Sequence, residues 1–315
     1  MQGKSGQDRR EGRIGVRRRG VWGIIAALTV AASASGCVTI SPLAATGDFP
    51  VAAGVQLSSS TFDRMMQRDQ GKGQIIIGVK NDQPGLGYYD PTTHQYTGFD
   101  IEVAELIAAG LGFTRSQIQF VPIQSINREN AIQNQSVDLV VASYSYTSVR
   151  AQSVSFAGPY FETGEALLVR DNEPNVTGFS SFTSSNRICS VTNSSPLGAL
   201  PHLTSAVAVA RTAYSECVSA LTSHSVDAVY TDLAVLAGYA AQDPTHLKII
   251  ATTGDAQPQY YGIGLPLADA ALKAKINDIL ATAERNGTWQ AIFNATLAPS
   301  GIKATAPKIG TFPSS

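Results

Sequence analysis

Residues 138–150 read Asp-Leu-Val-Val-Ala-Ser-Tyr-Ser-Tyr-Thr-Ser-Val-Arg. The apolar run at 139–142 is typical of a short buried strand, and two serines follow it directly. Thr147 is placed to cap a following helix that carries Arg150 in its first turn. An arginine offers two parallel donors that match a carboxylate, and hydroxyls and helix-terminal N–H groups supply further hydrogen bonds. The stretch therefore predicts a carboxylate-binding corner, with an ordinary strand, turn and surface arginine as the alternative.

Strand and helix patterns alternate on the N-terminal side of this stretch. The helix that opens near Asp100 has apolar residues at helical spacing, and Asp100 is expected to be its N-cap. An order of strand, helix, strand, helix and strand predicts a mainly parallel sheet in an α/β fold. The expected elements are strand 75–79, a helix from Asp100, strand 118–122, helix 128–134 and strand 137–142.

The same alternation repeats on the C-terminal side, through strand-like runs from 166–170 to 247–252, before a return strand at 261–265 and two terminal helices. This repeat predicts a second lobe inserted in the first. Two chain crossings, near 168–171 and near 257–261, would form a hinge between the lobes. The expected organisation is lobe 1 at 74–168 plus 260–300, lobe 2 at 169–259 and a C-terminal tail at 301–315.

The N-terminal residues have the pattern of an export signal. A basic stretch precedes an apolar core at 21–32, which is too short to span a membrane stably. Ala-Ser-Gly-Cys at 34–37 then looks like a lipoprotein cleavage box. We expect residues 1–36 to be a lipoprotein signal peptide and Cys37 to be lipidated, with an unused thiol as the alternative. Residues 37–73, rich in small and hydroxyl residues, are expected to be a flexible tether with one short helix near 62–68.

Export places the mature chain in an oxidising compartment, where cysteines tend to pair. Cys189 and Cys217 are the two cysteines that remain, so they are candidates for a disulfide. Closing this loop would be worth about 3–4 kcal/mol in the chain-entropy model. Two buried free thiols are the alternative.

Charge and motifs exclude several classes of protein. The whole chain has a net charge of −1, and residues 1–37 hold seven basic and two acidic side chains, so the remainder carries about −6. It has no basic stripe for nucleic acid. A nucleophile elbow, a zinc pair and a phosphate loop are also missing from the sequence, and its four histidines lack metal spacing. We therefore expect a binding protein without metal or cofactor rather than an enzyme.

Several short motifs, none specific alone, are collinear with one family over residues 74–297. The chain resembles the extracytoplasmic solute-binding proteins of family 3, the receptors of polar amino-acid ABC transporters, and among them the actinobacterial glutamate/aspartate-binding lipoproteins. The resemblance implies a type II periplasmic-binding-protein-like fold, in which two mainly parallel sheets are joined by a two-strand hinge. Its carriers are residues 77–80, 83–87, 98–101, 133–138, 145–150, 158–160, 226–228 and 261–264.

The resemblance also implies where an amino acid would bind. Arg150 would take the α-carboxylate, and Asp232 would take the α-ammonium; the alternative for Asp232 is a helix N-cap, which is compatible with the binding role. Hydroxyl and N–H groups would help from both lobes, including the turn at 193–195, where family members usually have glycine in place of Asn193. The further residues implied are Ser143, Ser145, Ser194 and Ser195, with Tyr144 as an apolar wall.

Specificity is assigned to Lys80, Ser125 and Arg128. Receptors for basic amino acids have an acid at the position of Lys80, whereas those for glutamate and aspartate resemble this chain. Two cations beyond Arg150 would overcompensate a neutral side chain but balance a second carboxylate. A solvated strand-end lysine and a helix-surface arginine are the alternatives.

The expected function is a monomeric, lipid-anchored receptor on the outer face of the cell membrane. It would bind glutamate or aspartate, with asparagine and glutamine as further candidates, and deliver the ligand to an ABC permease. One alternative is a receptor that signals to a membrane sensor. Another is a dehydratase-like enzyme, because this fold also hosts such enzymes.

Overall fold

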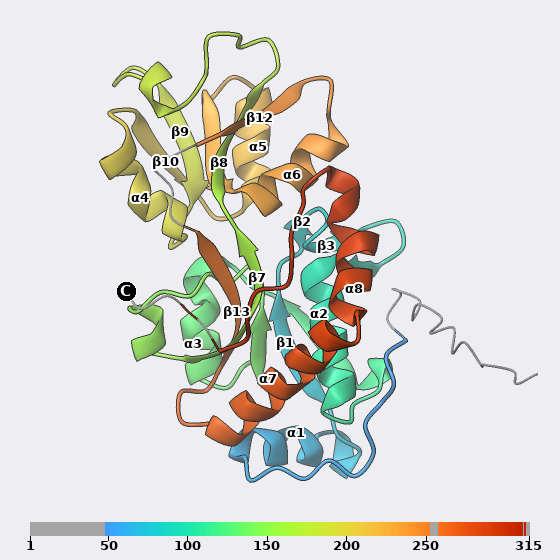
Figure 1. Ribbon diagram of the computed structural model, residues 1–315. Coiled ribbons are helices and arrows are strands. Elements are labelled where there is room, and N and C mark those ends of the chain that lie inside the picture. Colours follow the sequence, from blue (N-terminus) through green and yellow to red (C-terminus); the bar gives the residue numbers. More distant parts are fainter. Residues whose placement is uncertain (1–47, 253–257, 311, 313–315) are drawn as a thin grey trace, which may run out of the picture. The chain divides into compact units, whose positions relative to one another are not determined.

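The computed structural model describes residues 48–252, 258–310 and 312. The expected signal peptide, Cys37 and the part of the expected tether up to residue 47 lie outside these residues. The described residues all belong to one compact unit, residues 41–315. Within this unit the chain forms two sheets of five strands and one small sheet of three (Figure 1).

The sheet of lobe 1 has the strand order β5-β1-β6-β13-β7, and β13 runs against the other four strands. Alternate residues of β6 enter different cores: Leu139 and Val141 pack with α2, α7 and α8, whereas Val140 packs on the side of α3. The strands are β1 (Ile75–Val79), β5 (Ile118–Pro122), β6 (Leu139–Val141), β7 (Ser155–Thr163) and β13 (Gln259–Leu265). The helices are α2 (Phe99–Gly110), α3 (Arg128–Gln133), α7 (Ala270–Arg285) and α8 (Thr288–Thr296).

The sheet of lobe 2 repeats this plan in the order β10-β9-β11-β8-β12, and here β8 is the reversed strand. The strands are β8 (Glu165–Arg170), β9 (Arg187–Val191), β10 (Val207–Arg211), β11 (Ala228–Asp232) and β12 (Leu247–Ala251). The helices are α4 (Ser195–Leu203), α5 (Tyr214–Thr222) and α6 (Leu233–Gln242). The small third sheet, β2 (Asp82–Gln83), β3 (Gly87–Asp90) and β4 (Gln95–Thr97), lies near α2 and lobe 2. Two mainly parallel sheets confirm the predicted two-lobed α/β fold.

The first hinge crossing differs from the expected range of 168–171. Strand β7 of lobe 1 continues into β8 of lobe 2 through Gly164 (Figure 1). Residues 165–170 are all buried and pair with β11 and β12, which places them in lobe 2. The second crossing joins β12 to β13 and includes residues outside the described ones. Gln259 and Tyr260 already pair with β7, so they belong to lobe 1.

Cys189 of β9 and Cys217 of α5 form a disulfide with a Cα–Cα distance of 5.5 Å. Both side chains are fully buried. The bond confirms the predicted pairing and fastens the first turns of α5 to the sheet of lobe 2.

Part of the expected tether is packed on lobe 1. Helix α1 (Ser60–Gly71) buries Phe62 and Met65, and two of its arginines reach the fully buried carboxylate of Asp138 at the start of β6. Arg64 Nη2 and Arg68 Nη2 lie 3.0 and 2.8 Å from Asp138 Oδ1. A buried carboxylate is stable only when it is paired and hydrogen-bonded, so this contact holds α1 against the sheet.

The C-terminal segment also packs against the fold. It runs from the end of α8 past the hinge strands (dark red in Figure 1), and the Gly310 N–H donates to the Gly158 carbonyl at 2.7 Å. The ring of Phe312 stacks on Tyr146 with centroids 4.5 Å apart. A Cβ on Gly262 of β13 would lie 2.9 Å from Phe312, so the missing side chain at Gly262 makes room for this ring.

We expect Phe312→Ala to lower the free energy of unfolding by about 1–2 kcal/mol, because the ring loses buried apolar contact. Urea unfolding measures this loss. The matched control is Leu267→Ala, since Leu267 is 56% exposed and its truncation should change stability by less than about 0.5 kcal/mol. Equal effects of the two variants would contradict the docking of Phe312.

Candidate functional site

Residues of both lobes enclose one small cavity. Eight of the ten ligand residues expected from the sequence line it, together with two that were not expected, Pro196 and Tyr214. The eight are Ser125, Arg128, Ser143, Ser145, Arg150, Ser194, Ser195 and Asp232. The other two, Lys80 and Tyr144, do not line the cavity but contact residues that do. The structure therefore brings the expected residues together, although they come from distant parts of the chain.

Arg150 lies just after the turn that leaves β6. Its backbone N–H donates to Thr147 Oγ1 at 3.1 Å, so the threonine caps this turn, but the turn is a short 3-10 helix, Arg150–Gln152, instead of an α-helix. The side chain is buried, and its Nη1 donates to the Ser145 carbonyl at 2.7 Å. The turn predicted around Thr147 is thus formed, and the guanidinium of Arg150 is buried against it.

Arg150 also reaches lobe 2. Its Nη1 donates to Ser195 Oγ at 3.1 Å and its Nη2 to the Asn193 carbonyl at 2.8 Å. The lobes also meet where the Ser215 N–H donates to Asp82 Oδ2 at 3.1 Å. These contacts describe a closed arrangement of the two lobes around the cavity.

The turn before α4 provides the lobe 2 side of the cavity. Asn193 has a φ of +62°, in the left-handed region that glycine adopts readily and asparagine tolerates. Asparagine therefore fits here where glycine is usual. Ser194 is the N-cap of α4 and accepts from the Leu197 N–H at 3.2 Å, and Pro196 lies in the first turn. The positive end of α4 consequently faces the cavity.

Asp232 stands between β11 and α6. Its Oδ2 accepts from the Tyr261 hydroxyl at 2.6 Å, whereas Oδ1 has no hydrogen-bond partner among the described residues. Asp232 is the N-cap residue of α6, but its side chain makes no capping hydrogen bond to the helix. Burial raises the pKa of Asp232 to about 7, against the opposing effect of the Tyr261 hydrogen bond. A buried, unpaired carboxylate oxygen that lines a cavity is suited to a cationic group.

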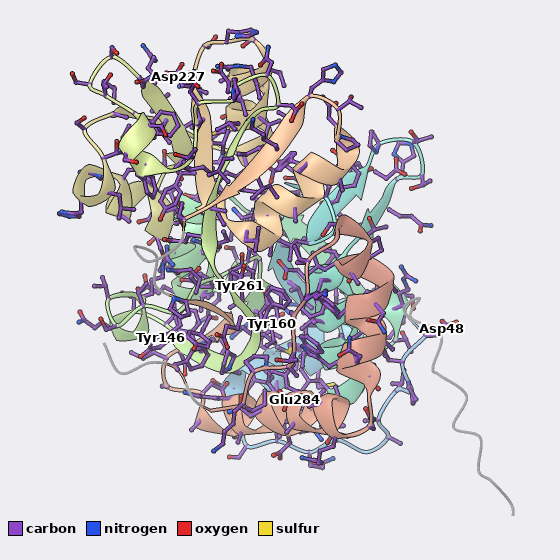
Figure 2. All side chains as sticks on the ribbon, turned by 45° about the horizontal axis from the view of Figure 1, so that its top comes forward. Asp48, Tyr146, Tyr160, Asp227, Tyr261 and Glu284 are labelled. Atoms are coloured by element: carbon purple, nitrogen blue, oxygen red, sulfur yellow. A yellow bond between two sulfur atoms is a disulfide. The ribbon has the colours of Figure 1, made fainter. Side chains whose placement is uncertain are left out.

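Tyr261 of β13 and Tyr160 of β7 lie close together in lobe 1 (Figure 2), with ring centroids 6.1 Å apart. Tyr160 donates to Asp100 Oδ1 at 2.8 Å, and the Ser143 N–H donates to Asp100 Oδ2 at 2.7 Å. Burial raises the pKa of Asp100 to about 6. Asp100 was expected to be the N-cap of α2, but the helix begins at Phe99 after Gly98, and Asp100 instead supports the binding corner.

Arg128 is buried, which excludes the alternative of a helix-surface charge. Its Nε donates to the Ser125 carbonyl and its Nη1 to the Ala142 carbonyl, both at 3.2 Å, and the guanidinium lies 4.3 Å from the centre of the Tyr144 ring. No carboxylate of the described residues lies within salt-bridge distance of it. Burial and the neighbouring Arg150 lower the pKa of Arg128 to about 10.

Lys80 follows β1 and is only 5% exposed, so it is not a solvated strand-end lysine. Its Nζ donates to Ser125 Oγ at 2.9 Å and to the Ile123 carbonyl at 3.2 Å. Burial, then Arg128, lowers the pKa of Lys80 to about 7. Lys80 and Arg128 thus meet at Ser125 and form one cationic end of the site.

Sequence reasoning missed three further contributors. Tyr214, at the start of α5, lines the cavity one turn before the disulfide cysteine Cys217. Gln83 Oε1 accepts from Ser143 Oγ at 2.9 Å. Glu129 Oε1 lies 3.3 Å from Arg150 Nε. Only Glu129 carries a local signal, because it directly follows Arg128 in the chain.

The described residues contain no group of three or more metal-ligating side chains close enough to hold an ion. None of the described helices is long and apolar enough to cross a membrane. The groups of the site that can hold a ligand are therefore its charged and hydrogen-bonding side chains. Arg150 and Lys80 contribute positive charge to the site, and Asp232 contributes a carboxylate. Hydroxyl and N–H donors lie between them.

Comparison with known proteins agrees with this arrangement. Residues 75–297 match the model of the bacterial extracellular solute-binding proteins, family 3. The chain is 33% identical over 233 residues to the glutamate-binding protein GluB of Corynebacterium efficiens, which covers 71% of this chain and 79% of that protein. It is 28% identical over 221 residues to the ABC transporter glutamine-binding protein GlnH of Bacillus subtilis, covering 70% and 80%.

Among solved structures, an ancestral arginine-binding protein bound to arginine is 27% identical to this chain. It superposes with a TM-score of 0.64 and covers 71% of this chain and 97% of the other. The fold and the family match together confirm the resemblance seen in the sequence. The chain belongs to the bacterial extracellular solute-binding proteins of family 3.

Proposed function

We propose that this protein is the receptor of an amino-acid ABC importer and that its ligand is an acidic amino acid, glutamate or aspartate. The observation that carries the ligand class is the cationic end of the site, where Lys80 and Arg128 are buried without a carboxylate partner among the described residues. Buried charges are stable when they are paired, and a ligand carboxylate would pair both. The relatives named for glutamate and glutamine support an amino-acid ligand.

The proposed pose uses every charge of the site. The α-carboxylate lies on Arg150 with help from the serine hydroxyls and the start of α4. The α-ammonium lies on the unpaired Oδ1 of Asp232. The side-chain carboxylate lies toward Arg128 and Lys80, with Ser125 between them. A neutral amide in the same place would leave the charge of the two cations uncompensated, so glutamine and asparagine are expected to bind more weakly.

Closure of the lobes would complete the site, because Arg150 belongs to lobe 1 while Ser195 and Asp232 belong to lobe 2. The closed form is then the shape that a permease recognises, and a membrane sensor is the second candidate partner. We further propose that residues 1–36 are removed on export, that Cys37 anchors the monomer by a lipid, and that the protein acts by binding and not by catalysis. In this pose Asp232, Asp100 and Glu129 have binding or supporting roles.

A thermal-shift screen of residues 38–315 against the twenty amino acids tests the proposed function. We expect stabilisation by glutamate or aspartate, with smaller shifts from their amides, because a ligand that binds only the folded state raises the melting temperature. Arg150→Ala and Asp232→Asn are expected to lose every shift, since they remove partners common to all amino acids. A protein that responds to none of the twenty would contradict the proposal.

We expect the preference for glutamate over glutamine to decrease at least about tenfold between about pH 6 and about pH 9. Lys80, whose pKa is lowered to about 7, loses the proton that attracts a side-chain carboxylate as the pH rises. The bound anion shifts this loss to somewhat higher pH. Asp232 contacts a group that both ligands share, so its titration cancels in the affinity ratio.

Calorimetry with both ligands at several pH values measures this ratio, and Lys80→Met is the matched control. The Lys80→Met variant should have a lower ratio of glutamate affinity to glutamine affinity than the wild type. This ratio should not change with pH in the same range. If wild type and variant show the same pH dependence, Lys80 does not set the specificity.

A further inference from the structure

Glu129 is the one acid of the described residues within salt-bridge distance of any cation of the site. It lies in the first turn of α3, directly after Arg128, and its side chain is 17% exposed. Its Oε1 is 3.3 Å from Arg150 Nε. No ligand role was assigned to it above, because it contacts the binding arginine from outside the cavity.

The contact determines which edge of the guanidinium faces the cavity. A guanidinium has five N–H groups in a rigid plane, and a carboxylate takes two of them at a time. Glu129 pairs with the guanidinium on its Nε side, and the terminal Nη1 and Nη2 groups reach Ser195 Oγ and the Asn193 carbonyl across the cavity. Without Glu129, the Nε edge would be free to compete for the ligand.

Charge gives a second reason for an acid at this position. Arg128, Arg150 and Lys80 are buried near one another, and the guanidinium groups of the first two lie 4.3 and 5.4 Å from the centre of the same Tyr144 ring. Like charges this close repel, which favours rotation of a flexible arginine away from the others. The carboxylate of Glu129, 3.3 Å from Arg150 Nε, offsets part of this repulsion and holds Arg150 in place.

We propose that Glu129 is a positioning residue, which holds Arg150 by Nε so that its two terminal amino groups face the α-carboxylate of the ligand. This inference rests on the proposed function. It implies that Glu129 sets the affinity for every α-amino acid alike, whereas Lys80 and Arg128 set the choice between side chains.

The binding test compares Glu129→Ala and Glu129→Gln with Asp278→Asn, an exposed acid on α7. The ligands are glutamate, glutamine and isoglutamine, the α-amide of glutamate. We expect Glu129→Ala to weaken glutamate and glutamine by the same factor, about tenfold, with a smaller loss in Glu129→Gln and none in Asp278→Asn. Isoglutamine lacks the α-carboxylate, so the variant and the wild type should bind it equally weakly. General damage to the fold would instead weaken all three ligands alike.

A second measurement needs no ligand. The Arg150 Nε–H resonance, identified by its absence in Arg150→Lys, should be resolved and protected from exchange in the wild type and should lose that protection in Glu129→Ala. An unchanged resonance, or an unchanged affinity for glutamate, would overturn the positioning role. Failure of the wild type to bind any amino acid would refute the proposed function, while the resonance would still report on the contact.

Discussion

The two lobes share one buried guanidinium, that of Arg150. It is held by the Ser145 carbonyl and Glu129 in lobe 1, and in the closed arrangement it donates to Ser195 and Asn193 in lobe 2. A buried guanidinium must keep its hydrogen bonds, because an unpaired buried charge costs several kcal/mol. Any acceptor on lobe 2 that completes the hydrogen bonds of Arg150 therefore favours the closed arrangement of the lobes. A ligand carboxylate at this place would link binding directly to the relative position of the lobes.

The charges around Arg150 are arranged in two layers. The inner layer lines the cavity and includes Asp232 and Arg128, neither of which has an ion-pair partner among the described residues. The outer layer consists of acids that already have partners, Asp100 with Ser143 and Tyr160, and Glu129 with Arg150. The outer layer fixes the geometry of the corner, which leaves the inner layer to determine what binds. Such a division explains why residues that touch no ligand can still govern affinity.

Sequence patterns predicted the parts of the structure that depend on local chemistry. The strand and turn around Thr147, the repeated strand-helix alternation and the pairing of Cys189 with Cys217 all follow from neighbouring residues or from elimination. They did not predict contacts between distant segments. Asp138 pairs with arginines about seventy residues earlier, and Asp100 bonds Ser143 and Tyr160, so these roles appear only once the sheet is assembled. Glu105 shows the same limit: this acid of α2 is buried, 3.1 Å from Arg115, a contact that the local pattern of the helix does not indicate.

A crystal structure of residues 38–315 grown with glutamate would show directly how the ligand lies between Arg150, Asp232 and the cationic end of the site. We predict closed lobes with the α-carboxylate on Nη1 and Nη2 of Arg150, the ammonium on Asp232 Oδ1, and the side-chain carboxylate at Arg128 and Lys80. Glutamate bound in the opposite direction, with its side-chain carboxylate on Arg150, would contradict the assignment of the two ends of the site. A ligand that leaves Lys80 and Arg128 without a carboxylate would contradict the proposed basis of specificity.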